Sequence, residues 1–197
     1  MKFKSVKKVW ATIAVAGVVG LGAGLTNSPI FPAHQVDAAA ANQDNSASEH
    51  ALQTLKSFYK PALKGEFPGA VSNLTVGKST RKEVIKAIGE PEQPRKNASG
   101  YDVYSANMGN PGYAITYNKS DKIREIRYFG TNVERQTNIG GITMSMVKQH
   151  WLAPNSTTTI KNGKAKQTKF TYIRGNYKVE FIFNSSTDLD HINLLAK

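Results

Sequence analysis

The chain has 197 residues and a formal net charge of +12 at pH 7, from 26 lysine and arginine residues against 14 aspartate and glutamate residues. It contains no cysteine, which excludes disulfide bonds, thiolate metal sites, cysteine nucleophiles and lipid attachment through a cysteine. The length suits one ordinary domain with a hydrophobic core. The basic excess either attracts polyanions or only keeps the protein soluble.

Residues 1–40 have the layout of a secretory signal peptide. Four lysines among residues 2–8 precede an apolar run over residues 9–25, and an alanine run follows that includes Ala39 and Ala40. We therefore predict cleavage near Ala39 or Ala40 and a secreted, extracellular protein, with wall association as a further option. An uncleaved anchor is the alternative, because the apolar run approaches spanning length. After cleavage no membrane span would remain, and 22 basic against 13 acidic residues would give a net charge of +9.

The rest of the chain divides into a linker and one domain. Residues 41–48 are small and polar, which predicts a flexible linker. Apolar residues then repeat at helical spacing, so we expect a helix that begins at Ser48 or Glu49 and is stopped by Pro61. Residues 49–197 would form a single secreted α+β domain.

A short, sharply bounded helix is predicted after Thr80. Thr80 and Glu83 have the spacing of a capping box, in which each side chain bonds to the backbone amide of the other residue. Apolar residues at positions 84, 85 and 88 give the helix one buried side. Gly89 favours a left-handed helix end, and Pro91 prevents continuation.

A weaker copy of this pattern occurs 63 residues later. Thr143, Val147, Trp151 and Pro154 occupy the positions of the first cap, two apolar residues and the terminal proline. We infer an α+β fold of two tandem helix-plus-antiparallel-sheet repeats, about 49–130 and 131–197, with the helices on one face of the sheet. Alternating apolar residues and turn formers predict strands over residues 101–105, 113–117, 123–129, 156–160, 168–173, 177–183 and 190–195.

Two stretches resemble known families. The motif at residues 77–91 resembles the lead motif of the small outer-membrane assembly lipoproteins and of the β-lactamase-inhibitor-protein fold, where a helix pair packs on an antiparallel sheet. Residues 107–113 (NMGNPGY) and 127–136 (RYFGTNVERQ), followed by Gly140 and Gly141, resemble the YjgB-like family of secreted Gram-positive proteins. That second resemblance implies an extracellular domain of unknown function, and it carries no catalytic or ligand residue with it.

The sequence contains no strong catalytic or metal-binding motif. His50, His150 and His191 lack metal-ligand spacing, and the acidic pair Asp188 and Asp190 lacks the third acidic residue and the glycine of a calcium loop. No Gly-x-Ser-x-Gly nucleophile elbow occurs. We therefore expect no metal and no cofactor. A hydrolase would have to use acidic residues that spacing alone does not pair, namely Asp102, Glu125, Glu134 and Glu180.

The stretch 127–136 is the first candidate binding site, because arginine and tyrosine dominate binding hot spots. The residues selected from it and from a neighbouring predicted strand are Tyr113, Arg127, Tyr128, Glu134, Arg135 and Gln136. The alternative is that its charged side chains tie the two repeats together. In that case Arg127 or Arg135 would be substantially buried and bonded to a carboxylate or to backbone carbonyls.

The second candidate site is a basic cluster around a predicted hairpin turn at Asn162 and Gly163. It is either a phosphate-binding finger or an ordinary solvated loop. Few aromatic residues are interleaved with the lysines, so we expect no nucleic-acid partner. The lysines are Lys161, Lys164, Lys166 and Lys169.

These features together favour a secreted, non-catalytic binding module that recognises a protein or an anionic wall polymer at the cell surface. The alternative is a cell-envelope-acting hydrolase that uses acidic residues. An enzyme should show a deep pocket with converging polar groups, whereas a binding module should show an exposed sheet face.

Overall fold

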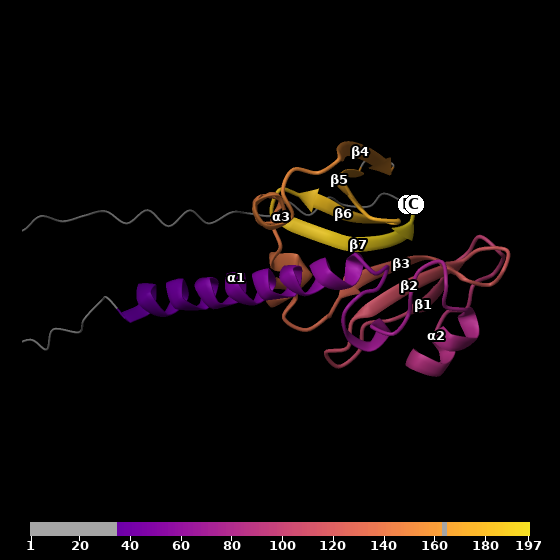
Figure 1. Ribbon diagram of the computed structural model, residues 1–197. Coiled ribbons are helices and arrows are strands. Elements are labelled where there is room, and N and C mark those ends of the chain that lie inside the picture. Colours follow the sequence, from indigo (N-terminus) through magenta and orange to yellow (C-terminus); the bar gives the residue numbers. More distant parts are fainter. Residues whose placement is uncertain (1–34, 163–164) are drawn as a thin grey trace, which may run out of the picture. The chain divides into compact units, whose positions relative to one another are not determined.

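The computed structural model describes residues 35–162 and 165–197. These residues form three α-helices, short 3-10 turns and one antiparallel sheet of seven strands (Figure 1). The α+β class is thereby confirmed. The helices are α1 (Gln35–Ala62), α2 (Arg81–Ile88) and α3 (Met144–Trp151), and the strands are β1 (Asp102–Tyr104), β2 (Gly112–Tyr117), β3 (Ile123–Gly130), β4 (Ser156–Asn162), β5 (Ala165–Arg174), β6 (Tyr177–Ser185) and β7 (Asp188–Ala196).

The strand order in the sheet is β1-β2-β3-β7-β6-β5-β4. The last strand, β7, returns to pair with β3, with Glu125 opposite Leu195 and Tyr128 opposite Ile192. The strands before α3 and those after it therefore share one continuous sheet. The organisation as two tandem repeats stays a prediction, because this topology alone does not relate the two halves to each other.

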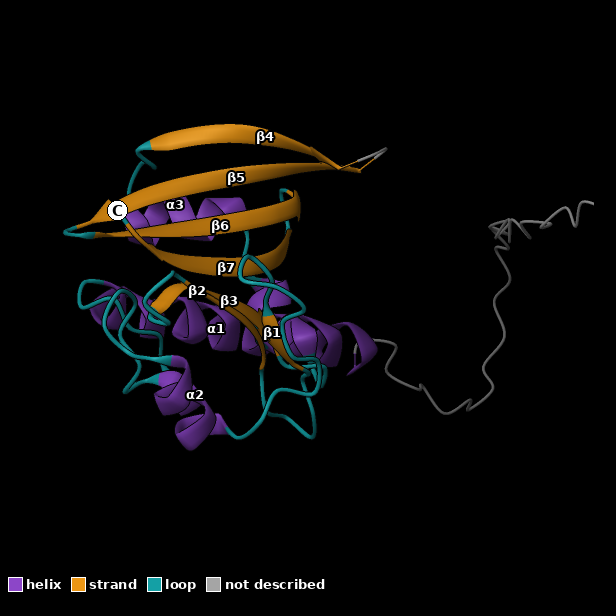
Figure 2. Ribbon diagram, turned by 90° about the vertical axis from the view of Figure 1, so that its right-hand side faces the viewer, coloured by secondary structure: helices purple, strands orange, loops and turns teal. Residues whose placement is uncertain are grey.

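Helices α1 and α3 cover the same face of the sheet, as Figure 2 shows. Phe58 of α1 packs edge-on against Tyr128 of β3, with 5.0 Å between ring centroids, and Trp151 of α3 packs edge-on against Phe181 of β6 at 4.9 Å. All four rings belong to the buried core. Side chains alternate across a strand, so the residues next to Tyr128 and Phe181 point to the other side of the sheet. That side, which none of the described helices covers, is called the open face below.

The predicted helix after Thr80 is present as α2, with both hydrogen bonds of the capping box. The Glu83 amide donates to the Thr80 hydroxyl at 3.4 Å, and the Thr80 amide donates to the Glu83 carboxylate at 2.7 Å. Gly89 follows the helix with φ +85°. Helix α3 begins in the same way, because the Met146 amide donates to the Thr143 hydroxyl at 3.1 Å.

Helix α1 is longer than predicted. It begins at Gln35 and includes residues 41–48, where we expected a flexible linker, and it includes Pro61 in its last turn. Alanine has the highest helix propensity of any residue type, and four alanines occupy residues 38–41. The helix that contains them continues through the small polar residues that suggested a linker. The apolar part of the predicted signal peptide lies outside the described residues, and cleavage near Ala39 or Ala40 stays a prediction. Among the described residues, no helix combines the length and hydrophobicity that crossing a membrane requires.

An ion pair joins α2 to the first strand. Asp102 is 0% exposed, and its carboxylate accepts two hydrogen bonds from the Arg81 guanidinium, at 2.7 and 3.3 Å, and one from the Arg95 amide at 2.9 Å. Burial alone would raise the pKa of Asp102, but these bonds together lower it. The position of α2 therefore depends on an ionised, buried carboxylate.

Candidate functional site

A row of polar side chains crosses the middle of the open face. Strand pairing places Glu180 of β6 opposite Asn193 of β7, and Asn193 opposite Arg127 of β3. Glu125 lies two residues before Arg127 and shares its face. Glu125, Glu180 and Asn193 are only 6%, 9% and 5% exposed, although they point away from the helices. Neighbouring side chains on this face therefore cover them, which is unusual for the solvent side of a sheet.

Arg127 is the centre of a closed network on this face. Its Nε donates to the Glu125 carboxylate at 2.6 Å, and one terminal nitrogen donates to the Tyr101 hydroxyl at 2.6 Å. The Tyr101 hydroxyl donates in turn to Glu125 at 3.0 Å, and the guanidinium lies 4.4 Å from the centroid of the Tyr101 ring. Burial and the Glu125 carboxylate raise the pKa of the Tyr101 hydroxyl, so it stays a donor at neutral pH. The three side chains hold one another in a fixed arrangement.

A second ion pair lies two strands away. The Lys169 ammonium of β5 contacts the Glu180 carboxylate at 3.2 Å. Asn193 lies on the strand between β6 and β3, and its Oδ1 is buried without a hydrogen-bond partner among the residues that the structure describes. Buried side-chain amide oxygens are normally bonded, so this one marks a place where polar partners are incomplete.

His191 and Asp190 form a third polar element beside this row. The His191 Nδ1 and a carboxylate oxygen of Asp190 are 2.6 Å apart, and the imidazole lies 5.3 Å from the ring of Phe129. The hydrogen bond from His191 is the main cause that lowers the pKa of the Asp190 carboxyl, against the effect of burial. Since an ionised carboxylate can only accept, Nδ1 carries the proton and Nε2 is the basic nitrogen.

These elements surround a shallow hollow of about 290 Å³, which we call the sheet groove. Its two arginine or lysine cations are matched by two glutamates, in the pairs Arg127 with Glu125 and Lys169 with Glu180. The groove is therefore close to electrically neutral. The residues that line it are Glu125, Arg127, Ile160, Gln167, Lys169, Glu180, Ile182, His191, Asn193 and Leu195.

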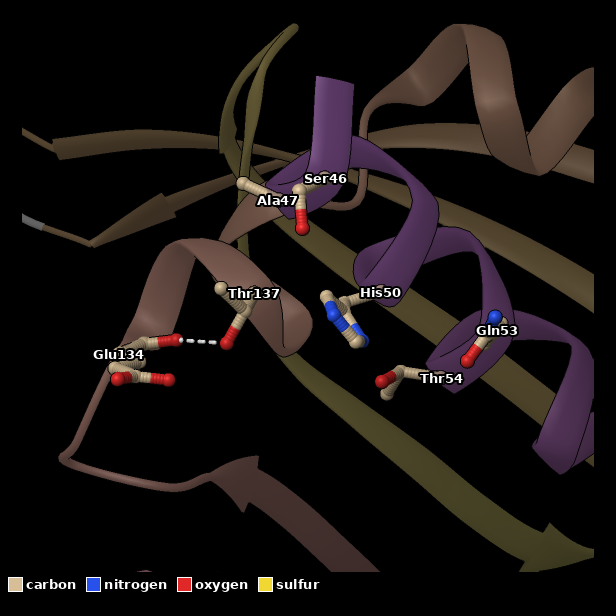
Figure 3. A pocket seen from close by; sticks show the side chains of 7 residues that line it. All are labelled: Ser46, Ala47, His50, Gln53, Thr54, Glu134 and Thr137. Carbon is tan, nitrogen blue, oxygen red and sulfur yellow. Dashed lines mark hydrogen bonds between the residues drawn. The ribbon is translucent and has the colours of Figure 1, made fainter. Parts of the chain in front are cut away.

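A larger hollow of about 620 Å³ lies between α1 and the turn at Glu134–Thr137 (Figure 3). His50 points into it from α1, and the hydrogen bond drawn in Figure 3 joins the Thr137 hydroxyl to the Glu134 carbonyl at 2.8 Å. His50 and Glu134 are both exposed. No described contact fixes the His50 ring, whereas the groove holds its charged side chains in ion pairs. We therefore take the sheet groove as the candidate site.

The structure separates the residues of the first predicted binding site. Arg127 lies in the sheet groove, but Tyr113 and Tyr128 are 3% and 7% exposed and pack against each other in the core at 5.7 Å. Both rings face the helices, because one-residue alternation places them opposite to Arg127. A partner on the protein surface does not reach them, so they are removed from the candidate surface.

The other three residues of that prediction lie in the connection after β3. Glu134 and Gln136 are exposed, and Glu134 has φ +49°. The Arg135 guanidinium donates to the Leu189 carbonyl at 2.5 Å and to the Phe129 carbonyl at 3.3 Å. It also lies 3.6 Å from the Asp188 carboxylate. Arg135 therefore fastens the connection to β7 by bonds to backbone carbonyls, as the structural alternative expected, but its side chain is 37% exposed and not substantially buried.

The basic cluster is divided between the two faces of the sheet. Lys161 and Lys166 are directly opposite each other on β4 and β5, and Lys169 is three residues further along β5. The odd spacing puts Lys169 on the open face, where it is paired with Glu180, and the other two lysines on the helix side. Lys164 lies outside the described residues. The described lysines do not form one phosphate-binding finger.

Sequence reasoning missed the groove residues Asn193 and His191 and the role of Tyr101. One signal was present, because alternation in β6 points Glu180 away from the core side of that strand. What could not be read was which residues of β3 and β7 would lie beside it, since that depends on the pairing of distant strands.

Within residues 35–162 and 165–197, no three histidine, aspartate or glutamate side chains converge in a way that could hold a metal ion. The calcium candidates Asp188 and Asp190 instead both accept hydrogen bonds from the Asn184 amide, at 3.1 Å each.

Comparisons with known proteins concern this same part of the chain. A family model described as "Domain of unknown function (DUF4309)" matches residues 55–195, which include every residue of the sheet groove. The uncharacterized protein YjgB of Bacillus subtilis (strain 168) is 37% identical over 196 residues, which cover 97% of this chain and 100% of that protein. The crystal structure of a DUF4309 family protein (YjgB) from B. subtilis subsp. subtilis str. 168 is 38% identical with a TM-score of 0.69, over 76% of this chain and 99% of that chain.

Proposed function

The chain belongs to the DUF4309 family, whose domain has no known function, and we propose a function from the geometry of the sheet groove. We propose that the protein is a secreted, non-catalytic module that binds a protein at the cell surface. The resemblance to the YjgB-like family is confirmed by the same comparisons. The observation that carries the proposal is the polar row on a sheet face that none of the described helices covers, in which Glu180 and Asn193 are buried and Arg127 is partly exposed.

The state of these side chains favours binding. Glu125, Glu180 and Asn193 have already lost most of their hydration, because each is at most 9% exposed before any partner arrives. Arg127 is held in place by Glu125 and by the Tyr101 ring. A partner would therefore meet a preorganised surface and immobilise few side chains, which lowers the entropic cost of association. Arginine and tyrosine are also the residue types that most often dominate binding energy.

The charge balance of the groove bears on the kind of partner. Each cation is matched by a glutamate, so a polyanion would find no excess of positive charge there. A protein segment offers donors and acceptors in alternation, which complements such a surface. The anionic wall polymer that we also considered would need another part of the molecule.

The pair His191 and Asp190 supports the second candidate function, a cell-envelope-acting hydrolase. An aspartate that holds Nδ1 leaves Nε2 available as a general base, and His191 lines the same groove as Glu180. Incubation of purified cell wall with the protein would test this. Release of soluble fragments that His191→Gln abolishes would establish the hydrolase and overturn the non-catalytic proposal.

Two substitutions on one edge strand test the binding proposal. Ile160 of β4 lines the groove, whereas the next residue back, Thr159, is exposed and points to the other side of the sheet. We expect Ile160→Trp to fill the groove and to reduce capture of a partner from a cell-envelope fraction at least tenfold. Thr159→Trp adds the same ring to the same strand and should leave capture unchanged. Equal capture by both variants would contradict a role for this face.

A further inference from the structure

Leu152 is an exposed leucine in a backbone conformation that glycine normally occupies. It follows the last residue of α3 with φ +66° and ψ −168°, and it is 74% exposed. The corresponding residue after α2 is Gly89, with φ +85° and ψ −175°. A leucine in this region is strained, and such strain often marks a functional position. Its exposed side chain gains little from packing, so the fold itself does not explain why leucine stands there.

The residue before Leu152 is a buried tryptophan that contacts an exposed tyrosine. The preceding residue, Trp151, packs edge-on against Tyr59 of α1 at 5.2 Å, and Tyr59 is 39% exposed. Between the two helices is a hollow of about 510 Å³. Its lining residues are Lys56, Ser57, Tyr59, Lys60, Pro61, His150 and Trp151.

Two lysines and no acidic residue are among the described residues that line this hollow. Residues 56–64 contain three lysines and no acidic residue, and residues 148–155 contain Lys148 and His150 and no acidic residue. Neither Lys56 nor Lys60 forms an ion pair with a residue that the structure describes. Exposed apolar side chains within a set of lysines are the usual composition of a surface that lies on an anionic bilayer.

We propose that Leu152 and Tyr59, with Lys56, Lys60 and His150, form a membrane-docking patch that binds the surface of a bilayer containing anionic lipids. Leu152 enters the boundary between headgroups and acyl chains, and Tyr59 lies at the headgroup level, where aromatic rings with a polar end are favoured. The lysines remain in the headgroup layer on their flexible stems and contact lipid phosphates.

Other occupants fit the patch less well. A second copy of the chain would bring two surfaces of the same charge together, which is repulsive. A binding site for an acidic peptide would be expected to offer arginine side chains, which bind carboxylates through two hydrogen bonds, and acceptors that fix the position of the peptide. The patch offers mobile lysines and a protruding leucine instead, which suit a fluid anionic surface.

Vesicle co-sedimentation tests the proposal. The core that the structure describes lies within residues 35–197, which form one compact unit, so this segment is the one to test. One probe is vesicles of phosphatidylcholine with about 30 mol% phosphatidylglycerol, an anionic lipid that gives the surface a negative potential. The other is vesicles of phosphatidylcholine alone. We expect binding to the anionic vesicles only, weakened about tenfold by Leu152→Gly. Replacing Lys56 and Lys60 with glutamine should weaken it about 25-fold, since each lysine near an anionic surface contributes roughly fivefold.

Matched controls distinguish binding through the patch from nonspecific binding through net charge or exposed apolar side chains. Met108 is also a non-glycine residue with positive φ and is 93% exposed, so Met108→Gly removes an equivalent side chain elsewhere. Lys78 and Lys82 are exposed near α2, and their change to glutamine removes the same charge. These controls should bind as the parent does. Equal weakening by controls and patch variants would overturn the proposal, as would equal binding to both vesicle types. Absence of vesicle binding would also overturn it and favour an acidic protein partner.

Discussion

The Arg174 guanidinium lies 5.2 Å from the centroid of the Trp151 ring and donates a hydrogen bond to the Trp151 carbonyl at 3.1 Å. The same guanidinium lies 4.9 Å from the Tyr172 ring and 5.5 Å from the Tyr59 ring. One side chain at the end of β5 therefore joins α1, α3 and the sheet. It also places a positive charge at the C-terminus of α3, where the helix dipole favours it.

We expect Arg174→Lys to lower the free energy of unfolding by about 2 kcal/mol. Lysine keeps the charge but loses the planar group that stacks on three rings and bonds to the Trp151 carbonyl. Urea denaturation followed by tryptophan fluorescence measures the change. Arg124 of β3 is exposed, so Arg124→Lys should leave the midpoint unchanged. A parent-like midpoint for Arg174→Lys would show that charge alone suffices at this junction.

The ends of α2 and α3 should respond in opposite directions to substitution. Leu152→Gly should raise the free energy of unfolding by about 1 kcal/mol, because relief of the positive φ exceeds the entropy that glycine adds to the unfolded chain. Gly89→Val should lower it by about 2 kcal/mol, because a β-branched residue resists positive φ. A Cβ at Gly89 meets no atom within 4 Å, so any loss there comes from the backbone. Thermal denaturation of both variants in one buffer would contradict this if the two shifts had the same sign.

The buried Asp102 makes stability depend on pH in the acidic range. Its pKa is lower in the folded protein than in the unfolded chain, so its contribution is fully present above about pH 4 and is lost as the pH falls through the folded-state value. Asp102→Asn should cost about 3 kcal/mol at pH 7, because Arg81 loses its partner. It should also flatten the decline of stability below pH 4.

Urea denaturation at a series of pH values between 2 and 7 measures both effects. The control is Asp121→Asn, which removes a carboxylate that contacts Arg95 at 2.8 Å but whose side chain is 51% exposed. That pair should contribute less than about 1 kcal/mol. If the free energy of unfolding falls with pH below pH 4 as steeply in Asp102→Asn as in the parent, other groups cause the acid sensitivity.

The two arginines of the stretch 127–136 should differ in what they support. Arg135→Met should lower the free energy of unfolding by about 2 kcal/mol, since it removes hydrogen bonds from a charged donor to the Leu189 and Phe129 carbonyls. Arg127→Met should cost about 3 kcal/mol, because Glu125 is buried and would lose its counter-charge. Denaturation midpoints measure both.

The pair Arg127→Met with Glu125→Gln provides the matching control. If the cost of Arg127→Met comes from the uncompensated carboxylate, the double variant should recover part of the lost stability. No recovery would show that stacking on Tyr101, rather than the ion pair, holds this network together.

Features that depend on neighbours along the chain could be predicted from the sequence. The cap at Thr80, the helix end at Gly89 and the alternation of β6 follow from interactions within about four residues, which a linear pattern records. The α+β class followed from the number and order of such elements. The extent of α1 was misjudged because residues 42–48, which are mostly poor helix formers, continue the helix that contains the alanine run at residues 38–41.

Which distant side chains meet depends on how the strands pair in the folded protein. Tyr128 lies in the core and Arg127 in the groove because β3 has one particular register, and a shift of one residue would exchange them. The groove exists because β7 returns to lie between β3 and β6, which brings Asn193 between Arg127 and Glu180. Residues 64 to 70 positions apart in the sequence become neighbours in this way. No local rule encodes such a pairing, because it is selected by the burial of the whole helix-facing side of the sheet.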